Sequence, residues 1–356
     1  MPSLKAIRKR ISSVKNTQKS TKAMKVVAAA KLRRVQDVVN LLRPYARRMQ
    51  QVVTNLVGSL PVPKRQDDLY GDASSEQTGS IEQSGSTQTQ EILHTEVAST
   101  LNSLVFGRKE KRIRVVLLSS ERGLAGSFNT MVYRFFEQFV AQTSFDVLDL
   151  DVIGKKGREF FQRRVSKEGT LGSYKKPGVY FGQTTPGIDP KNTQQMAHDL
   201  ALKYTKAIVA GELDALYFVY NEYQVGQAPK VRAKRLLPVR AYVEDADGLV
   251  DTNSTEVVSQ EVLTTEGLGF ADYIYEPEQR QIVEQLLPLS LETQIQRILL
   301  ESISAELRSR MLAMDNASRN AKEMIQTLTL EFNRARQAAI TKELMEVVSG
   351  AEAIKG

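Results

Sequence analysis

Residues 4–56 decide the fold of this chain, and they read LKAIRKRISSVKNTQKSTKAMKVVAAAKLRRVQDVVNLLRPYARRMQQVVTNL. Steps of three and four residues along this stretch select sixteen positions, of which thirteen are apolar. A repeat that averages 3.5 residues is typical of a helix that keeps one stripe against a partner in a left-handed supercoil. We therefore expect a coiled-coil helix over residues 1–60, with a length of roughly 80 Å. The selected positions are Leu4, Ile7, Ile11, Val14, Gln18, Thr21, Lys25, Ala28, Leu32, Val35, Val39, Leu42, Ala46, Met49, Val53 and Leu56.

Two features interrupt this seam. The three polar positions, Gln18, Thr21 and Lys25, are consecutive along it. Pro44 has no N–H group and its ring clashes with the preceding turn, so a kink or a break is expected near Arg43.

The positive charge of the chain is concentrated on this first helix. Residues 1–48 contain fourteen Lys or Arg and a single acid, Asp37, whereas the whole chain has a net charge of only +8. Such a rod favours an acidic protein partner. A nucleic-acid partner and a simply solvated face are the alternatives, although zipper-type DNA-binding proteins separate the basic region from the heptads and here the two coincide.

The composition restricts the chemistry of the chain. There is no cysteine, which excludes disulfides, thiol catalysis and Cys-ligated zinc. No apolar run is long enough to span a membrane. The two histidines, His94 and His198, are about a hundred residues apart and read as ordinary surface residues. Without a base beside it, Ser119-Ser120 is not a convincing nucleophile.

The middle of the chain changes character twice. Residues 61–110 read as a low-complexity linker, with a polar stretch at 66–90 and a short helix at 91–106. Residues 111–275 read as an α/β domain with a small, mainly parallel sheet, because apolar strand-like runs alternate with helical segments. The expected strands are 113–118, 145–153, 215–223 and 234–239, the expected helices are 128–141, 156–164 and 191–210, and an acidic excursion is expected at 243–269.

Residues 276–356 are predicted to form the second long helix. Pro288 is expected to kink it near its start, and Gly350 is expected to end it. Together the two terminal helices predict an antiparallel coiled coil of the chain's own ends beside the α/β domain. The predicted apolar stripe comprises Ile295, Ile298, Ile303, Leu307, Leu312, Met314, Ala317, Ala321, Met324, Leu328, Ala335, Ala338 and Met345.

Sequences associated with nucleotide chemistry are missing. No G-x-x-x-x-G-K-[ST] loop occurs, and residues 154–157, GKKG, lack both its spacing and its hydroxyl. No G-x-G-x-x-G or H-E-x-x-H pattern occurs either. The chain is therefore expected to be non-catalytic by itself, with no cofactor and no metal.

Long ordered segments of the chain resemble the gamma subunit of the F-type ATP synthases. The resemblance covers both termini and the middle of the chain. The segments are SLKAI (3–7), VKNTQK (14–19), TKAMKVVAAAKLRR (21–34), ERGLAGSFN (121–129), DYIYEP (272–277), RM (310–311), AMD (313–315), NA (320–321), FNRARQAAIT (332–341) and EL (343–344).

This resemblance implies a central rotor shaft. It implies alpha and beta subunits, the epsilon subunit and the membrane c-ring as partners, with no nucleic acid. It implies that Met24, Arg336, Gln337 and Thr341 contact beta-subunit loops. The residues implied to contact the ring and epsilon are Tyr273, Tyr275 and Glu276.

The chain departs from the family pattern in three places. Ala125 stands where the family usually has cysteine, Ser127 replaces a glycine, and residues 66–90 are extra length. A chain without cysteine cannot use the dithiol switch of plastid-type subunits. Because the helix begins almost at Met1, a bacterial chain at the cytoplasmic face of the inner membrane is expected.

Overall fold

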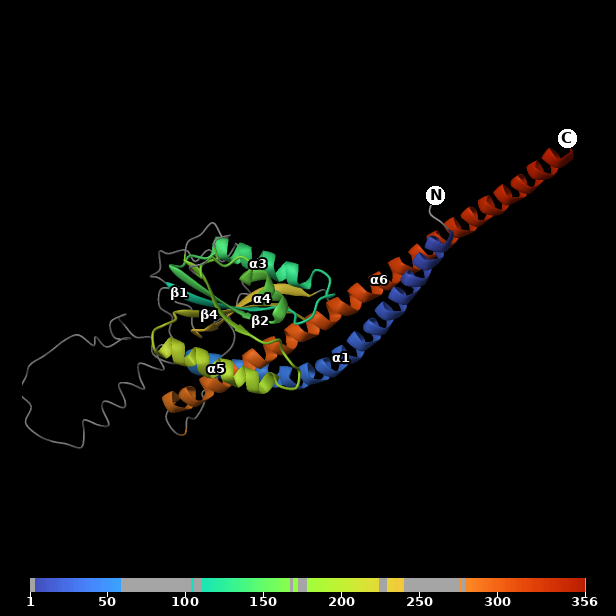
Figure 1. Ribbon diagram of the computed structural model, residues 1–356. Helices are drawn as coiled ribbons and strands as arrows, with labels where there is room; N and C mark the ends of the chain where they lie inside the picture. The colour runs from blue at the N-terminus through green and yellow to red at the C-terminus, as the bar shows by residue number, and fades with distance from the viewer. Residues whose placement is uncertain are drawn as a thin grey trace, which may run out of the picture. The chain divides into compact units, whose positions relative to one another are not determined.

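The computed structural model describes residues 4–58, 104–105, 110–166, 169–171, 178–223, 229–239, 276 and 279–355 (Figure 1). The described residues form two compact units. One unit is formed by the described residues of 1–33, 124–126 and 307–356, and the other by those of 34–123 and 127–306. The elements are α1 (Leu4–Gly58), β1 (Arg112–Leu118), α3 (Phe128–Gln142), β2 (Val147–Ile153), α4 (Lys155–Gln162), β3 (Val179–Thr185), α5 (Thr193–Val209), β4 (Ala215–Glu222), β5 (Lys230–Leu237) and α6 (Gln279–Lys355).

The second unit is built around a five-stranded sheet with the order β3-β2-β1-β4-β5. Strands β1, β2, β3 and β4 are parallel, and β5 is antiparallel to β4. Val115 at the centre of β1 pairs with Leu150 of β2 on one side and Tyr217 of β4 on the other. The predicted fold class, terminal helices with a small and mainly parallel α/β domain, is confirmed.

Each face of the sheet carries its own apolar cluster, because successive side chains of a strand point to opposite faces. Ile113 and Val115 of β1 pack with α3 and α4 on one face. Val116 and Leu118 pack with α5 and with the parts of α1 and α6 in this unit on the other face. Both faces are therefore covered by helices, which explains why β1 and β4 are almost continuously apolar.

The four predicted strands and three predicted helices of this domain are present, with shifted ends. The sequence analysis missed β3, whose side chains beyond Val179 are half-buried or exposed. Its sequence, VYFGQTT, lacks an apolar alternation because it lies at the edge of the sheet. Strand β5 begins at Lys230, four residues before the prediction, and in these additional residues Lys230 and Arg232 alternate with Val231 and Ala233.

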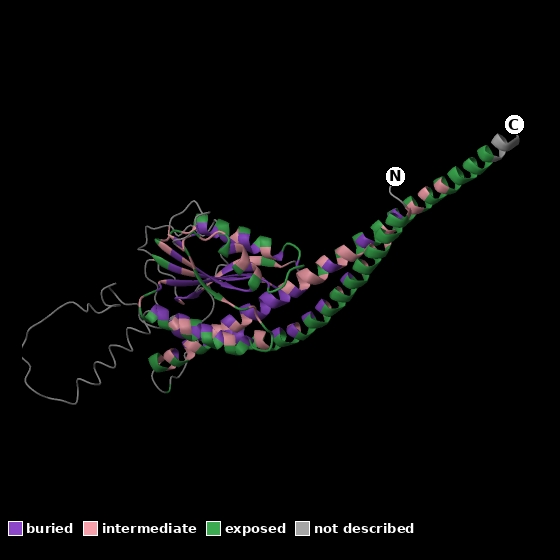
Figure 2. Ribbon diagram, in the orientation of Figure 1, coloured by how far each residue is buried: buried purple, intermediate pink, exposed green. Residues whose placement is uncertain are grey.

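Helix α1 confirms the predicted seam. None of the sixteen seam positions is exposed. Figure 2 shows buried positions recurring along α1 between exposed ones. A kink or a break was predicted near Arg43, and because the helix continues through Pro44 to Gly58, there is no break. Packing of the neighbouring seam residues offsets the hydrogen bond that proline removes.

The predicted stripe on α6 is only partly right. Leu312, Met324, Ala338 and Met345 are exposed. In the first unit, the buried and half-buried seam residues of α6 recur every seven residues along the helix. Three of the four exposed residues lie between these seam positions, and the fourth, Met345, lies beyond the last of them. Helix α6 also continues past Gly350 to Lys355. The observed seam comprises Leu307, Met311, Met314, Ser318, Ala321, Ile325, Leu328, Phe332, Ala335 and Ala339, all buried or half-buried.

Three sequence predictions fall outside the described residues. They are the polar stretch at 66–90, most of the helix at 91–106, and the acidic excursion at 243–269.

Candidate functional site

The interface between α1 and α6 in the first unit contains one interhelical ion pair among its described residues. Lys25 Nζ donates a 2.6 Å hydrogen bond to Oδ1 of Asp315. This hydrogen bond, together with the charges of Lys25 and Arg319, lowers the pKa of Asp315. Beside it, the hydroxyl of Thr21 donates to the Gln18 carbonyl at 3.0 Å. The polar interruption of the seam is therefore satisfied and helps to define one register of the two helices.

The remaining basic side chains of α1 point away from the seam. Of the fourteen Lys and Arg residues, only Lys25 and Arg43 are not fully exposed. Among the described residues, Lys25 is the only one of these fourteen side chains that forms an ion pair. The outer face of α1 therefore carries uncompensated positive charge, which favours an acidic partner surface.

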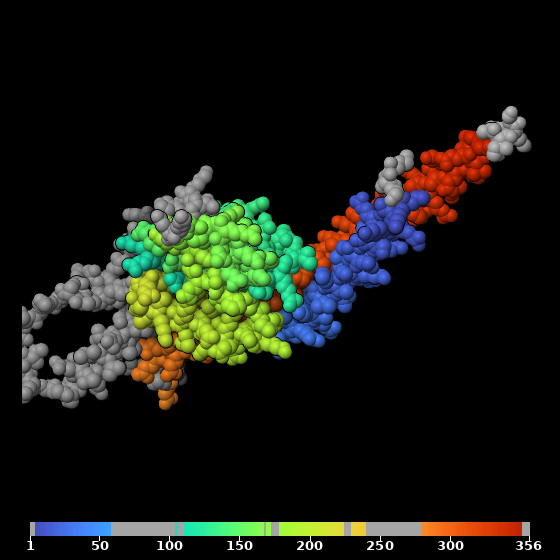
Figure 3. All heavy atoms as spheres, in the orientation of Figure 1, coloured from blue at the N-terminus to red at the C-terminus, as the bar shows by residue number. Residues whose placement is uncertain are grey.

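The last part of α6 has no partner among the described residues. Every residue from 340 to 350 is exposed, whereas the seam residues up to Ala339 are covered. Figure 3 shows the atoms of α6 continuing beyond those of α1 in this unit. Five large apolar side chains lie open on this end, which is typical of a surface that another protein covers. They are Ile340, Leu344, Met345, Val347 and Val348.

The four residues implied to contact beta subunits all lie in the first unit. Met24 is exposed on α1, and Arg336, Gln337 and Thr341 are exposed on α6. Of the residues implied to contact the ring and epsilon, Glu276 is exposed, and Tyr273 and Tyr275 lie outside the described residues.

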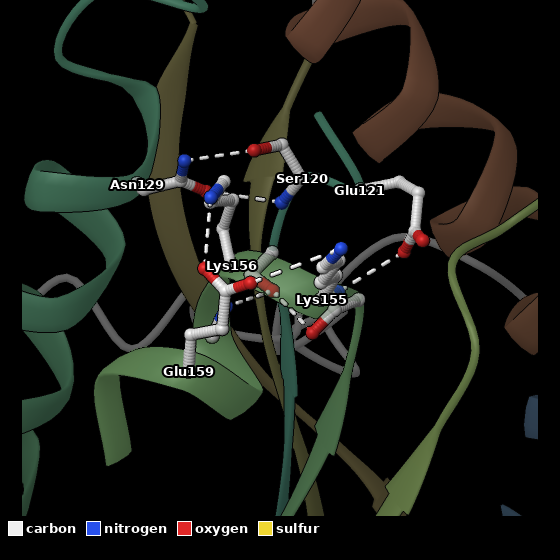
Figure 4. A network of polar contacts seen from close by, with 9 residues as sticks. Ser120, Glu121, Asn129, Lys155, Lys156 and Glu159 are labelled. Atoms are coloured by element: carbon white, nitrogen blue, oxygen red, sulfur yellow. Dashed lines mark hydrogen bonds and ion pairs between the residues drawn. The ribbon is translucent and has the colours of Figure 1, made fainter. Parts of the chain in front are cut away.

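The carboxyl ends of β1 and β2 form a polar network within the second unit (Figure 4). Ser120 and Asn129 are joined by two hydrogen bonds, from Ser120 N to Asn129 Oδ1 at 3.0 Å and from Asn129 Nδ2 to Ser120 Oγ at 2.7 Å. Ser119 Oγ donates to the carbonyl of Ile153 at 2.9 Å. Both hydroxyls therefore hold the loop after β1, and neither lies beside a histidine in the described chain.

This edge of the sheet is where open α/β folds bind ligands, often at a helix N-terminus. Here the first N–H groups of α4 already have acceptors within the protein. Lys155 N–H donates to Oε2 of Glu121 at 3.0 Å, and Gly157 N–H donates to Oγ of Ser119 at 2.9 Å. The carboxylate of Glu121 thus accepts from the N-terminus of α4, where the helix dipole favours a negative charge.

The tip of the loop after β1 belongs to the first unit. Ala125 is only 3% exposed, and a Cβ on Gly126 would lie 3.5 Å from that of Ala313. Leu124 adopts a positive φ of 65°, which is uncommon for a residue with a side chain. Ala125 and Gly126 therefore lie in a close-packed part of the first unit.

The sequence analysis missed a buried carboxylate, Asp151 of β2. It accepts hydrogen bonds from Lys203 Nζ at 2.9 Å, Tyr204 OH at 2.9 Å and the N–H of Gln183 at 2.8 Å. A Cβ at Gly182 would lie 2.3 Å from Asp151 Oδ1, so the edge strand needs glycine there. The signal was an acidic residue inside an apolar strand, VLDLDVI, but its partners on β3 and α5 are distant in sequence.

The described residues contain no group of three or more His, Cys, Asp or Glu side chains arranged to hold a metal ion. No helix among them combines the length and the hydropathy that crossing a membrane requires.

Comparison with known proteins matches the whole chain to one family. A family model described as ATP synthase matches residues 3–354. The chain is 36% identical over 358 residues to the ATP synthase gamma chain of Sorangium cellulosum, and 35% identical over 362 residues to that of Chlorobium phaeobacteroides. Each alignment covers 100% of both proteins.

Solved structures show the same fold. A chain of the Euglena gracilis mitochondrial ATP synthase rotor, in rotational state 1, aligns with a TM-score of 0.53 and 17% identity. That alignment covers 95% of this chain and 98% of the Euglena chain. On the full-length match to the family model and to these relatives, the chain belongs to the ATP synthase gamma chain family.

Proposed function

We propose that this chain is the central rotor shaft of an F-type ATP synthase, coupling proton translocation through the membrane ring to ATP synthesis or hydrolysis on the alpha–beta hexamer. The observation that carries the proposal is the arrangement of α1. Its apolar seam is covered at all sixteen positions while its basic side chains face outward. A shaft needs this combination of a stiff two-helix core and a charged outer surface for the subunits around it.

The proposed contacts with beta subunits are those of Met24, Arg336, Gln337 and Thr341. All four side chains are exposed, so they are available to a partner. The open apolar end of α6, residues 340–350, is the part of the shaft that we place inside the hexamer. Burial of its apolar side chains against the hexamer would contribute to assembly.

The proposed contacts with epsilon and the c-ring involve Glu276, which is exposed, together with Tyr273 and Tyr275. We also propose that the chain has no ATPase activity of its own. Its proposed location is the cytoplasmic face of a bacterial inner membrane, as a peripheral part of the complex. The bacterial relatives support that location.

Along the chain, we propose a division into a coiled-coil helix (1–60), a linker (61–110), an α/β domain (111–275) and a second coiled-coil helix (276–356). The two compact units of the structure cut across this division, because each long helix contributes to both of them.

Reconstitution tests the proposal directly. The purified chain is mixed with the alpha–beta hexamer, and the expected result is a stable complex on size-exclusion chromatography and ATP hydrolysis that increases when the chain is added. The chain alone is expected to hydrolyse no ATP. Lack of affinity for the hexamer, or steeply salt-dependent DNA binding that the hexamer does not compete with, would contradict the proposal and favour a nucleic-acid partner.

A further inference from the structure

An unpaired lysine lies on the helix-covered face of the second unit. In β5, Arg232, Lys234 and Leu236 alternate with Val231, Ala233 and Arg235, so the first three share one face of the sheet. Leu236 belongs to the apolar cluster formed with α1, α5 and α6, which places Lys234 on the same face. In the ladder, Lys234 pairs with Phe218 of β4.

The charged groups around Lys234 are already paired with one another. Arg232 lies 2.7 Å from Glu222, and Arg297 of α6 lies 2.8 Å from Glu301. Glu301 is only 1% exposed. Within the part of the chain that the structure describes, the Lys234 ammonium forms no hydrogen bond or ion pair. Three cations therefore share this region with two carboxylates, leaving one positive charge in excess.

Lys234 lines a small pocket of about 40 Å³ between α1, β5 and α6. One water molecule requires about 10–15 Å³ by the same measure, so the pocket admits a small ion or a few waters. Pockets for organic ligands are far larger, on the order of 300–1,000 Å³. Arg235 also lines the pocket, and it is paired with Glu110 at 3.1 Å. The uncharged polar residues of the lining can all donate hydrogen bonds, and they are Gln50, Thr54, Ser290 and Gln294.

The environment acts against the charged form of this lysine. Burial, and next the charge of Arg297, lower the pKa of Lys234 to about 8, while Glu301 and Glu222 act in the opposite direction. The neighbouring Tyr220 has a pKa raised well above its usual value, mainly by burial, and is neutral. At pH 7 most of the molecules thus hold a half-buried ammonium beside the charge of Arg297 and without an ion-pair partner of its own, an arrangement that a bound anion would stabilise.

We propose that this pocket binds one small monovalent anion of the halide class, held by the Lys234 ammonium and by hydroxyl and amide donors of α1 and α6. The anion supplies the counter-charge that the described residues lack, and it ties both long helices to β5. The pocket volume excludes phosphate esters and nucleotides. The proposal rests on the geometry of this pocket and is independent of the rotor function.

Thermal unfolding of the purified full chain tests the site. The chain is unfolded at pH 7 in mixtures of sodium chloride and sodium gluconate at constant ionic strength. A ligand that binds the folded state alone stabilises it by RT ln(1 + [L]/Kd), so Tm starts to rise when the ligand concentration reaches Kd and then increases with the logarithm of that concentration. We expect chloride and bromide to raise Tm in this way and gluconate to leave it unchanged.

The pH dependence gives a second readout. Binding requires the protonated lysine, and the protonated fraction falls above pH 8. The halide concentration at which Tm begins to rise reports the apparent Kd, and it is therefore expected to increase about tenfold between pH 7 and pH 9. A shift of this size is not expected from general salt effects, which do not depend on this lysine.

A matched pair of variants assigns the effect to the pocket. Lys234→Met keeps the length and apolar stem of the side chain and is expected to fold without any halide dependence of Tm. Lys206→Met, at an exposed position of α5, is expected to retain it.

Crystals of the full chain grown in bromide give a direct readout, with an anomalous peak expected within hydrogen-bond distance of Lys234 Nζ. Equal Tm values in chloride and gluconate, halide dependence that survives Lys234→Met, or a pocket that holds only water would overturn the proposal.

Discussion

Lys25 and Asp315 are separated by 290 positions in the sequence, yet their side chains are hydrogen-bonded at 2.6 Å across the coiled coil. Lys25 is the last of the three polar positions that interrupt the α1 seam, so the pair lies where apolar packing is weakest. A single polar contact in such a seam favours the one alignment of the two helices in which the polar groups meet.

The first prediction concerns this pair. Reversing one charge, as in Asp315→Lys or Lys25→Asp, is expected to lower Tm, because like charges then face each other across the seam. The double reversal is expected to recover most of the loss. Circular dichroism at 222 nm follows the unfolding. If the loss of Tm in the double variant equals the sum of the losses in the two single variants, the two residues do not interact.

The second prediction is the pH dependence of the same contact. The pKa of Asp315 is lower in the folded protein than in the unfolded chain. Its ionised form therefore stabilises the folded protein at pH values above the unfolded pKa of about 4, and this stabilisation is lost as the pH falls through the lower pKa of the folded state. We expect the difference in Tm between the wild-type chain and Asp315→Asn to be present at pH 6 and to vanish at strongly acidic pH. A difference that stays constant over this range would be inconsistent with the pair.

The third prediction compares two leucines on α6. Leu328 is 6% exposed in the observed seam, and Leu330 is 61% exposed. Leu328→Ala is expected to cost about 2–5 kcal/mol, because it leaves a cavity between the helices. Leu330→Ala is the matched control and is expected to change stability by less than about 0.5 kcal/mol. Urea unfolding of both variants measures the difference, and similar costs would mean that the seam is wrongly placed.

The fourth prediction concerns the buried carboxylate of the α/β domain. Asp151→Ala removes the acceptor of Lys203, Tyr204 and the Gln183 N–H, and leaves the ammonium of Lys203 without its partner. The expected loss of stability is about 3–5 kcal/mol. The exposed Asp199→Ala serves as the control, with a loss below about 0.5 kcal/mol. A mild effect of Asp151→Ala would show that water replaces the carboxylate in this network.

The fifth prediction concerns the open end of α6 and rests on the proposed function. Replacing Leu344 and Val347 by serine is expected to leave urea unfolding of the chain unchanged, because both side chains are already exposed. Affinity for the alpha–beta hexamer is expected to fall by about tenfold or more, since each apolar side chain buried on assembly contributes on the order of 1.5–3 kcal/mol. Leu202→Ser, exposed on α5, is the control. Unchanged affinity of the double variant would place the end of α6 outside the interface.

The features that were predictable are periodic and local. The α1 seam follows from steps of three and four residues in a single stretch, and all sixteen positions are covered. The strands β1 and β4 are buried on both faces, so their apolar runs identify them without knowledge of their neighbours. The second half of α6 was harder to predict, because its alanines and methionines fit several neighbouring stripes equally well.

The features that were not predictable depend on neighbours that are distant in the chain. Strand β3 has little apolar pattern of its own and is held by its hydrogen bonds to β2. Gly182 is required by the carboxylate of Asp151, which is about thirty residues earlier. Lys234 reads as an ordinary charged strand residue until α1 and α6 cover it and leave it without a partner.

By itself, the sequence determined that the chain has a long helix at each end, the first with a basic outer face, and an α/β domain between them in the sequence. Hydrophobic periodicity and charge are local properties of each segment. The tertiary structure decided which residues meet: Asp315 opposite Lys25, the N–H of Lys155 at the start of α4 donating to Glu121, and the unpaired Lys234 beside a small pocket. The physical reason is that pairing, burial and electrostatic compensation are properties of contacts between segments, and a one-dimensional pattern specifies a face of each segment without specifying the group that covers it.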